Sequence, residues 1–477
     1  MKETKSYIAI DLGAESGRII LGDVSSEQIK LNEIHRFINI PVQENDSLRW
    51  DFDLILTEIK RGISKAVNAT EVKISGIAVD SWGVDFGLLD TNGKLIENPY
   101  HYRDSRTDGI PEKAFEIMPL WDIFQNSGTQ FMKINSLFQL LALKHYNPEL
   151  LNKVSSLIFM ADLVSYHLCG QQFAEYSLAS TSQLMDISTG KWSQTIFDKL
   201  SLPVNIMPTI VQPGTIVGKL QGQICKELNI DPIDIIAVGS HDTASAVMAI
   251  PASQSASWAY ISSGTWSLMG IEADSPVINK DTFEQTFTNE GGVCNKIRLL
   301  KNMMGLWPLQ QCKNYWQQNG EKLSYSELVA MAQNASMANI KLDLSHESFF
   351  SPGNMPDKIN QYLKQTNQQQ LSDKGQIVRA ILDALAEQYN TAMLSLENLS
   401  KKTIDTIHIV GGGIQNELLC QLTANQTAKK IIAGPIEASA SGNIIMQAIA
   451  CGQIKSLQEG RNIILNSFET KEYLPQK

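Results

Sequence analysis

The sequence contains no long apolar run, and this absence narrows the class of protein that it can encode. Nowhere do about 18 apolar residues follow one another without interruption, the length that a membrane-spanning helix requires. The short apolar stretch near the start of the chain meets Asp11 too early to form the apolar core of a secretion signal. We therefore expect a cytoplasmic protein without a membrane partner.

Cysteine and basic residues are also scarce. The six cysteines lie far apart, with no C-x-x-C pair and no Cys/His cluster at metal-ligand spacing, so the common zinc and dithiol motifs are excluded. Lysine and arginine number 40 against 50 acidic residues, which gives a formal net charge of −10. Because nucleic-acid binding requires a basic surface, we predict no nucleic-acid partner. The sequence leaves open whether the chain is a monomer or a homodimer.

What is present indicates an α/β protein of two lobes. A chain of 477 residues is long enough for two or three compact cores of about 150 residues each. Apolar runs typical of strands alternate with amphipathic helical segments, such as Leu54 to Val67 with Asp53 as its predicted N-cap. A later helical pattern stops at Pro251 and is followed by small polar residues. We place the boundary there, between lobes 1–251 and 252–477.

One local pattern occurs in both predicted lobes. Residues 7–21 form an apolar run, a glycine-bounded turn and a second apolar run, the pattern of a β-hairpin. Residues 259–269 repeat this plan, with small polar residues in the turn. We interpret the repetition as an internal duplication.

The turn of the first hairpin carries groups suited to phosphate. Asp11 ends one strand, the glycines that follow let backbone N–H groups approach an anion, and Arg18 adds a cation. The segment is neither a P-loop nor a G-x-G-x-x-G motif. By itself it is equally typical of an ordinary hairpin with an aspartate in its turn, and residues 262–265 favour a plain turn. Two such hairpins on two lobes, however, can close on one triphosphate.

Two further segments combine a strand end with chemically useful groups. Residues 411–413 are glycines between a strand and an amphipathic helix, where bare backbone can face a nucleotide, although helix packing explains them equally well. His241 and Asp242 follow another apolar strand at a predicted helix start, where the carboxylate can accept a proton from an attacking hydroxyl. From sequence alone, N-capping by Asp242 or Thr243 is the more frequent role.

Residues 80–86 follow a buried strand with two carboxylates, a glycine and two aromatic side chains. Carboxylates can bind sugar hydroxyls while an aromatic ring covers an apolar edge of the sugar. Polar and aromatic side chains on an ordinary β-hairpin explain the segment equally well.

With these residues in hand, the chain resembles the FGGY family of carbohydrate kinases over nearly its whole length. The segments that carry the resemblance are Ala9–Gly13, His35–Phe37, Ser81–Phe86, Tyr102–Thr107, Ser240–Val247, Ser262–Gly270, Thr288–Gly292, Lys301–Trp307, Val410–Asn416 and Ala433–Ala438. The resemblance implies an α/β fold of two lobes, each with the ribonuclease-H-like core of the actin and hexokinase ATPases. It also implies an active site in the cleft between the lobes.

The same resemblance implies roles for individual residues. The nucleotide contacts that it implies are Ala14, Glu15, Ser16, Gly17, Arg18, Thr265, Gln310 and Gly412. The implied sugar contacts are Gly83, His241, Asp242, Thr243 and Asn302. Asp242 becomes the expected general base, and Asp11 becomes the carboxylate that holds Mg²⁺ through water. ATP and Mg²⁺ are therefore the expected cosubstrate and metal.

The implied reaction transfers the γ-phosphoryl group of ATP to O1 of a small ketose, with L-rhamnulose favoured by the sequence pattern. The methyl group of this 6-deoxy sugar requires an apolar wall, which Trp82, Phe86 or Phe131 can supply. Kinases of fuculose, xylulose, ribulose or glycerol are the nearest alternatives, and a non-catalytic regulator on the same fold is a more distant one. Glu15 departs from the family pattern, because many members carry a small hydroxylated residue in this turn. Its carboxylate either points outward or helps to hold the metal.

Overall fold

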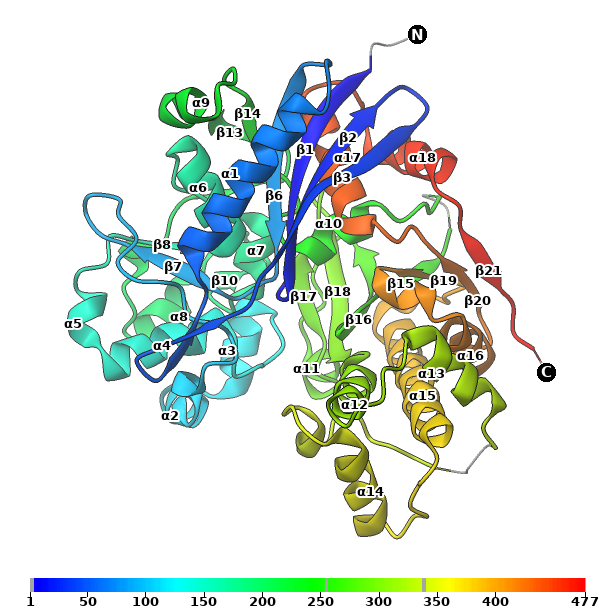
Figure 1. The fold of residues 1–477 in the computed structure, drawn as a ribbon. Coiled ribbons are helices and arrows are strands. Elements are labelled where there is room, and N and C mark those ends of the chain that lie inside the picture. Colours follow the sequence, from blue (N-terminus) through cyan, green and yellow to red (C-terminus); the bar gives the residue numbers. More distant parts are fainter. Residues whose placement is uncertain (1–3, 254–255, 337–339, 477) are drawn as a thin grey trace. The chain divides into compact units, whose positions relative to one another are not determined.

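The computed structural model describes residues 4–253, 256–336 and 340–476, and the chain forms two compact units (Figure 1). The first unit comprises residues 1–253, 272–299 and 437–468, and the second comprises residues 254–271, 300–436 and 469–477. Each unit is therefore assembled from separate stretches of sequence. The predicted lobe boundary after residue 251 stays a prediction, and residues 254–255, just beyond it, lie outside the described residues.

The first unit is built on a six-stranded sheet in the order β13-β14-β6-β1-β2-β3. The strands are β13 (Thr215–Lys219), β14 (Asp234–Ala237), β6 (Ile74–Ser81), β1 (Lys5–Leu12), β2 (Ser16–Val24) and β3 (Ile29–Ile38). Strands β14, β6 and β1 are parallel, whereas β1, β2 and β3 form an antiparallel meander. The hairpin predicted over residues 7–21 is confirmed. Every residue of β1 after Lys5 is buried, as expected of a strand covered on both faces.

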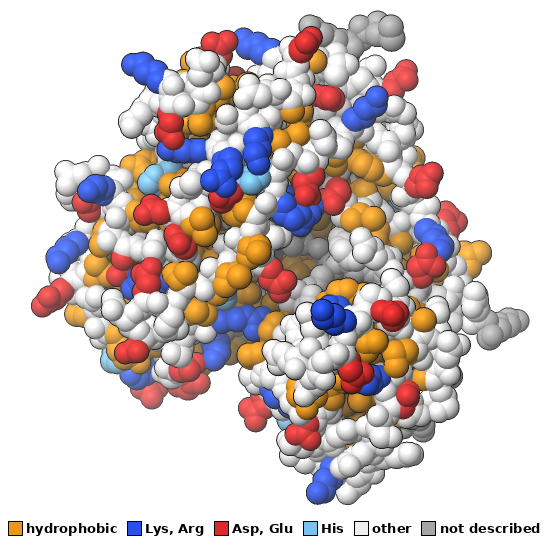
Figure 2. All heavy atoms as spheres, viewed as in Figure 1, with side chains coloured by type: hydrophobic (Ala, Val, Ile, Leu, Met, Phe, Trp, Pro, Cys, Tyr) orange, Lys and Arg blue, Asp and Glu red, His pale blue; other side chains and the backbone are white. Residues whose placement is uncertain are grey.

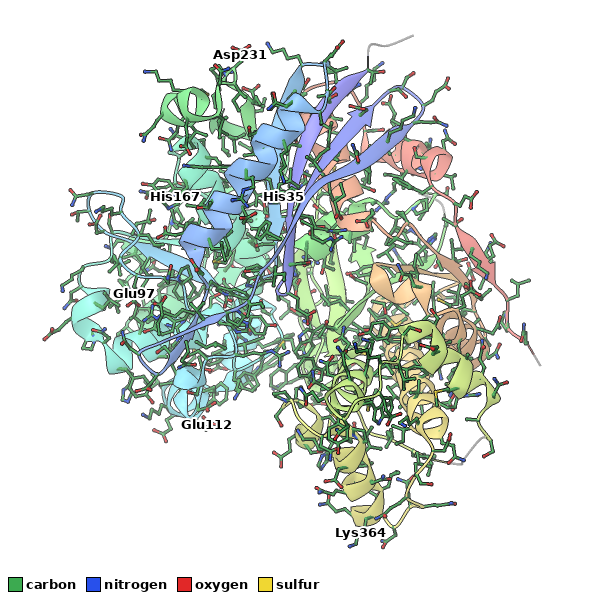
Figure 3. The ribbon with its side chains drawn as sticks, in the orientation of Figure 1. His35, Glu97, Glu112, His167, Asp231 and Lys364 are labelled. Carbon is green, nitrogen blue, oxygen red and sulfur yellow. The ribbon has the colours of Figure 1, made fainter. Side chains whose placement is uncertain are left out.

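Helices α1 (Phe52–Asn68) and α17 (Ala438–Ala450) cover opposite faces of this sheet (Figure 1). A Cβ at Gly62 of α1 would meet Ile19, whereas a Cβ at Gly22 would meet Ile444 of α17. Positions 19 and 22 differ by an odd number along β2, so they project to opposite faces. On the α1 side, Nε2 of His35 lies 2.6 Å from Oε2 of Glu58 (Figure 3 labels His35).

The N-cap of α1 corrects one prediction. Asp51, rather than Asp53, accepts a hydrogen bond from the N–H of Leu54 at 3.0 Å. Asp53 instead lies in the first turn, where a carboxylate interacts favourably with the helix dipole. The helix begins earlier than predicted, at Phe52. The side chain of Phe52 is buried in the core.

Further strands and helices complete the first unit. The strands are β4 (Val42–Glu44), β5 (Ser47–Arg49), β7 (Phe86–Leu89), β8 (Ser156–Phe159), β9 (Ala174–Glu175), β10 (Met185–Asp186), β11 (Lys191–Trp192), β12 (Ile210–Val211) and β17 (Thr288–Gly291). The helices are α2 (Ile110–Ile117), α3 (Leu120–Ser127), α4 (Ser136–Tyr146), α5 (Pro148–Leu151), α6 (Met160–Cys169), α7 (Tyr176–Thr181), α8 (Gln194–Lys199), α9 (Gly222–Leu228), α10 (Asp242–Met248), α11 (Lys280–Glu284) and α18 (Leu457–Ser467).

The second unit repeats the same sheet plan. The second sheet has seven strands in the order β17-β18-β16-β15-β19-β20-β21, where β15 and β16 form an antiparallel hairpin and β15, β19 and β20 are parallel. Their bounds are β15 (Trp258–Ser263), β16 (Trp266–Ala273), β18 (Ile297–Met304), β19 (Thr406–Val410), β20 (Lys430–Ala433) and β21 (Lys471–Tyr473). The order β20-β19-β15-β16-β18 matches β14-β6-β1-β2-β3 of the first unit, which confirms the predicted duplication.

In the described part of the second unit the helices are α12 (Trp307–Gln318), α13 (Tyr325–Asn334), α14 (Met355–Gln365), α15 (Lys374–Ser400) and α16 (Glu417–Thr427). Among the described residues, no helix is both long enough and apolar enough to cross a membrane. Acidic and basic side chains are interspersed on the face of the molecule that Figure 2 shows.

Candidate active site

In the first unit, the carboxyl ends of three neighbouring strands gather the acidic residues. Asp11 at the end of β1 is the register partner of Asp80 on β6. The next residue of β6, Ser81, bridges to His241, and its N–H donates to the carbonyl of Ser240 at 2.8 Å. Parallel strands end at the same edge of a sheet, which is where open α/β sheets bind ligands. The predicted metal ligand Asp11 and the predicted base Asp242 therefore lie at one edge of one sheet.

Asp80 is a member of this site to which the sequence prediction gave no role of its own. Its side chain is completely buried, and one carboxyl oxygen accepts from Nδ2 of Asn443 at 2.5 Å. The other oxygen has no hydrogen-bond partner among the described residues. Burial raises the pKa of Asp80 well above its usual range, and the nearby charges of Asp11 and Asp242 raise it further, while Asn443 opposes the shift.

Asp242 does not cap α10. The N-cap position belongs to His241, which makes no side-chain capping bond, and Asp242 lies in the first turn of the helix. Its carboxylate accepts a hydrogen bond from Oγ1 of Thr243 at 3.0 Å. Burial raises the pKa of Asp242 above its usual range, and Asp11 raises it further, whereas His241 lowers it. The N-capping alternative is thus not observed, and a carboxylate with raised basicity stands at the strand edge.

Gly83 lies two residues beyond the bridge between Ser81 and His241. A Cβ at this position would lie 2.9 Å from Oγ1 of Thr181, so the backbone here approaches α7 closely. The next residue, Val84, has a φ of 69°, a conformation that β-branched residues rarely adopt. The N–H of Val84 donates to Oγ1 of Thr181 at 3.2 Å, and the carbonyl of Val84 accepts from Oγ of Ser136 at 2.6 Å. These two hydrogen bonds hold the strained turn.

Behind this turn, Asp85 organises the aromatic residues. One of its carboxyl oxygens accepts from the indole N–H groups of Trp50 at 2.7 Å and Trp82 at 2.9 Å. The two indole rings pack with centroids 4.3 Å apart. Burial raises the pKa of Asp85 to about 6, although these hydrogen bonds oppose the shift. Of the three predicted wall residues, Trp82 and Phe86 are buried here, whereas Phe131 is 37% exposed.

The turn of the first hairpin is held in place by Asn39, the residue after β3. The side-chain amide of Asn39 donates to the carbonyl of Gly13 at 2.9 Å, and its backbone N–H donates to the carbonyl of Glu15 at 3.0 Å. Gly17 packs over the ring of Phe37, where a Cβ would lie 2.2 Å from the ring. Ala14 and Ser16 are half-buried, whereas the side chain of Glu15 is exposed to solvent. Of the two roles considered for Glu15, this exposure favours the outward one.

Arg18 donates hydrogen bonds to two carboxylates in this structure, and Nη1 also lies 4.0 Å from Oε2 of Glu33. Nη2 donates to Asp11, its register partner across the hairpin, and Nη1 donates to Glu437, which lies just before α17. These charges raise the pKa of Arg18 above its already high value, against the opposing effect of burial. The two bonds use two of the five N–H donors of a guanidinium, so three donors remain for phosphate oxygens.

The carboxylates fit the hard oxygen ligands that Mg²⁺ prefers. Within the described ranges, no three acidic, histidine or cysteine side chains are placed to hold a metal ion as a group. Mg²⁺ in nucleotide sites is usually held by one or two carboxylates together with phosphate oxygens and water, so a complete protein cage is not required. The unpartnered oxygen of Asp80 beside Asp11 is consistent with such a site.

The four remaining predicted contacts belong to the second unit. Gly264 and Thr265 form the turn of the second hairpin, and their carbonyls accept from the N–H groups of Leu306 at 2.8 Å and Gly305 at 3.1 Å. These bonds fix the start of α12, which carries Gln310, and the end of β18, which carries Asn302. Thr265, Asn302 and Gln310 are therefore held at the same end of the second sheet.

The glycines after β19 complete this group. Gly411 has a φ of 85°, and a Cβ at Gly413 would lie 2.0 Å from Oγ of Ser263, so both glycines allow close packing against the second hairpin. A Cβ at Gly412 would meet nothing within 4 Å, which leaves its backbone accessible to a flat ligand. Oγ of Ser263 and Oε1 of Gln310 are buried without a partner among the described residues. These polar atoms and bare backbone fit a nucleotide.

The sequence prediction missed Asp80, Asn443 and Glu437 as individual members of the site. Asp80 lies in the segment 80–86, whose carboxylates were considered for sugar hydroxyls and not for a metal site, and Glu437 lies in a segment that carried the family resemblance without a role of its own. Asn443 gave no such signal, because it contacts Asp80 from a helix 363 residues further along the chain.

Comparison with known proteins agrees with this geometry. The N-terminal domain of the FGGY family of carbohydrate kinases matches residues 6–249, and its C-terminal domain matches residues 259–451. A rhamnulokinase of Halalkalibacterium halodurans is 37% identical over 467 residues, which covers 98% of each chain. A rhamnulokinase of Bacteroides thetaiotaomicron is 38% identical over 472 residues, which covers 99% of this chain and 96% of the relative.

Solved structures of sugar kinases share the fold. A xylulose kinase of Lactobacillus acidophilus aligns with a TM-score of 0.81 at 18% identity and covers 99% of this chain and 94% of its own. Plasmodium falciparum glycerol kinase with ADP aligns with a TM-score of 0.76 at 17% identity, with the same coverage of 99% and 94%. The predicted two-domain α/β fold of the actin and hexokinase type is confirmed. Since family models match both parts of the chain and relatives match nearly all of it, the chain belongs to the FGGY family of carbohydrate kinases.

Proposed function

We propose that this chain is an ATP-dependent kinase that phosphorylates L-rhamnulose at O1, giving L-rhamnulose 1-phosphate and ADP, in the breakdown of L-rhamnose. The observation that carries the proposal is Asp242, a carboxylate of raised pKa at the strand edge that does not act as a helix cap. The relatives named rhamnulokinase support this acceptor over other ketoses, because they match nearly the entire chain at 37% and 38% identity.

In the proposed reaction, Asp242 accepts the proton of the O1 hydroxyl while that oxygen attacks the γ-phosphorus. The new O–P bond forms as the bond between the γ-phosphorus and the β–γ bridging oxygen breaks, and ADP departs with that electron pair. Gly83, His241 and Thr243 are assigned to the sugar, together with Asn302. Phosphoryl transfer depends mainly on such positioning and on electrostatic stabilisation.

Ala14 to Arg18, Thr265, Gln310 and Gly412 are assigned to ATP. Arg18 offers its remaining N–H donors to phosphate oxygens, and the open backbone of Gly412 offers a flat face to the nucleoside. Asp11 is assigned to Mg²⁺ through water, with the buried carboxylate of Asp80 beside it. When bound, Mg²⁺ supplies positive charge that offsets the negative charge of the phosphate oxygens.

Two measurements test the proposal. ADP release from ATP and Mg²⁺ should be fastest with L-rhamnulose in a panel that includes fuculose, xylulose, ribulose and glycerol. The Asp242→Asn variant should bind the sugar but lose about 10² to 10⁴-fold in kcat, the typical contribution of a positioned general base. Asp281→Asn is a matched control, because Asp281 also lies in the first turn of a short helix but is exposed. A kcat of Asp242→Asn within tenfold of the parent would contradict the assignment.

A further inference from the structure

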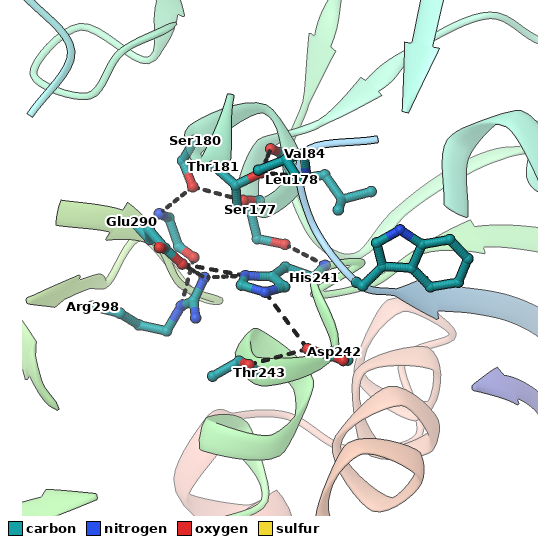
Figure 4. A network of polar contacts seen from close by, with 12 residues as sticks. Val84, Ser177, Leu178, Ser180, Thr181, His241, Asp242, Thr243, Glu290 and Arg298 are labelled. Carbon is teal, nitrogen blue, oxygen red and sulfur yellow. Dashed lines mark hydrogen bonds and ion pairs between the residues drawn. The ribbon is translucent and has the colours of Figure 1, made fainter. Parts of the chain in front are cut away.

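A buried network behind His241 belongs to none of the roles assigned so far. Glu290 on β17 and Arg298 on β18 are 4% and 0% exposed. Their side chains form an ion pair of 3.1 Å, and the same carboxyl oxygen of Glu290 lies 3.2 Å from Nδ1 of His241 (Figure 4). On its other side, Nε2 of His241 lies 3.6 Å from Oδ1 of Asp242. The imidazole ring therefore stands between two carboxylates, one of which is the proposed base.

The backbone around this network is fixed independently of the ring. Oγ of Ser177 on α7 accepts from the N–H of His241 at 3.0 Å, and Oγ of Ser180 on the same helix accepts from the N–H of Gly291 at 2.7 Å. The guanidinium Nε of Arg298 donates to the carbonyl of Gly291 at 2.9 Å. Helix α7 thus holds both His241 and the end of β17 in place, as Figure 4 shows.

The distances favour a proton on Nδ1 of the imidazole ring. Nη2 of Arg298, Oε2 of Glu290 and Nδ1 of His241 are separated by 3.1, 3.2 and 3.2 Å, so they form a nearly equilateral triangle. If Nδ1 were unprotonated, it would face the carboxylate with a lone pair. Nη2 of Arg298 would then have to donate to both Oε2 and Nδ1, which lie about 60° apart as seen from Nη2. The two hydrogens of Nη2 diverge by about 120°, so they cannot both point at these acceptors. A proton on Nδ1 lets both nitrogens donate to the carboxylate, which accepts several hydrogen bonds.

We propose that Glu290, held by Arg298, is a positioning residue that keeps His241 in the tautomer with its proton on Nδ1. Nε2 then presents a lone pair beside Asp242 and accepts a hydrogen bond from a hydroxyl of the bound sugar. An Nε2–H in the same place would donate toward Asp242 and lower the basicity of its carboxylate. The proposal rests on the proposed kinase function, because it takes Asp242 as the base.

The tautomer can be measured on the unmodified full-length protein without sugar. With ¹⁵N-labelled histidine, the two ring nitrogens of a neutral imidazole resonate at distinct positions according to which one carries the proton. The seven histidines are resolved by comparison with His241→Gln, whose spectrum lacks one set of signals. The expected result is a proton on Nδ1 of His241, and a proton on Nε2 would overturn the proposal. This readout does not depend on which sugar the enzyme uses.

Kinetics of Glu290→Gln test the consequence for turnover. We expect kcat for L-rhamnulose to fall about tenfold to a hundredfold, by analogy with the loss of a residue that orients a metal-bound histidine, with the KM for ATP within twofold of the parent. Glu272→Gln is the matched control, because Glu272 forms a similarly buried pair with Arg461 at 2.9 Å in the same unit. The control should keep its kcat. Equal losses in both variants, or an unchanged kcat in Glu290→Gln, would refute the proposal.

A second variant separates positioning from folding. Glu290→Gln leaves the buried guanidinium of Arg298 without its partner, which can destabilise the protein. The double variant Glu290→Leu with Arg298→Met removes both charges together. It should fold, lose the Nδ1–H preference of His241 and show the same drop in kcat. If it retains the tautomer and the parent kcat, Glu290 has no positioning role, whereas failure of the parent to phosphorylate L-rhamnulose contradicts only the proposed function.

Discussion

The buried Glu175 makes stability depend on pH in a direction that can be calculated. One carboxyl oxygen accepts from the N–H groups of Ser177, Leu178 and Ser240 and from the hydroxyl of Ser177. The side chain is completely buried, and burial raises its pKa from 4.5 to about 7 although these hydrogen bonds oppose the shift. A raised pKa means that the folded state binds the proton more tightly than the unfolded state. Proton binding by Glu175 therefore stabilises the folded state fully below about pH 4.5, and this stabilisation is lost as the pH rises through 7.

The Glu175→Gln variant removes this titration. A difference of 2.5 pKa units corresponds to about 3 kcal/mol, so the free energy of unfolding of the parent should fall by about that amount relative to the variant between about pH 4 and pH 8. Urea unfolding followed by circular dichroism at half-unit pH steps measures both curves. Glu116→Gln, at an exposed position of α2, controls for the loss of one carboxylate. Parallel pH curves for the parent and Glu175→Gln would refute this reasoning.

Three further variants test the packing and the aromatic residues of the site. Gly442→Ala should lower both the melting temperature and kcat, because its Cβ would lie 1.8 Å from the carbonyl oxygen of Ser245 on α10, whereas Gly222→Ala, with nothing within 4 Å, should leave both unchanged. Asp85→Asn should lower stability by about 1–3 kcal/mol in thermal unfolding, since the amide cannot accept from all the N–H groups that the carboxylate serves. Trp82→Ala should raise the KM for the 6-deoxy ketose about fourfold more than for a ketose without the methyl group, the equivalent of one buried methyl; equal changes would exclude Trp82 from the sugar pocket.

The local pattern of the sequence was sufficient to predict the α/β class and the two hairpins, whereas the ribonuclease-H-like core was implied by the family resemblance. An apolar run, a glycine-bounded turn and a second apolar run specify a hairpin through nearest-neighbour geometry, and both predicted hairpins are present. The N-cap of α1 was misplaced by two residues because Asp51 and Asp53 are both suitable caps by composition. Only the burial of Phe52 decides between them, and burial is a property of the folded sheet.

The site was less accessible to prediction because its polar contacts join distant segments. Arg18 was expected to face phosphate, yet in this structure it also pairs with Glu437, 419 residues away. Asp80 lies within an apolar strand, where one carboxylate is easily taken for a turn residue until its partner Asn443 is known. Similarly, the Glu290 carboxylate acquires a role only when β17 is placed beside His241. Such pairings depend on strand order and leave no periodic trace in the sequence.

The return of the chain to the first unit at α17 has a consequence during synthesis. About 180 residues separate the end of the first stretch at residue 253 from the start of the third stretch at residue 437, and the second stretch, residues 272–299, lies between them. At ribosomal rates of about 5–20 residues per second, the sheet face that α17 covers stays uncovered for roughly 10 to 40 s until α17 has been synthesised. During that time the growing chain exposes the apolar side chains of β1, β2 and β6 to other molecules. The first unit can therefore reach its final packing only after residues 437–468 have been synthesised.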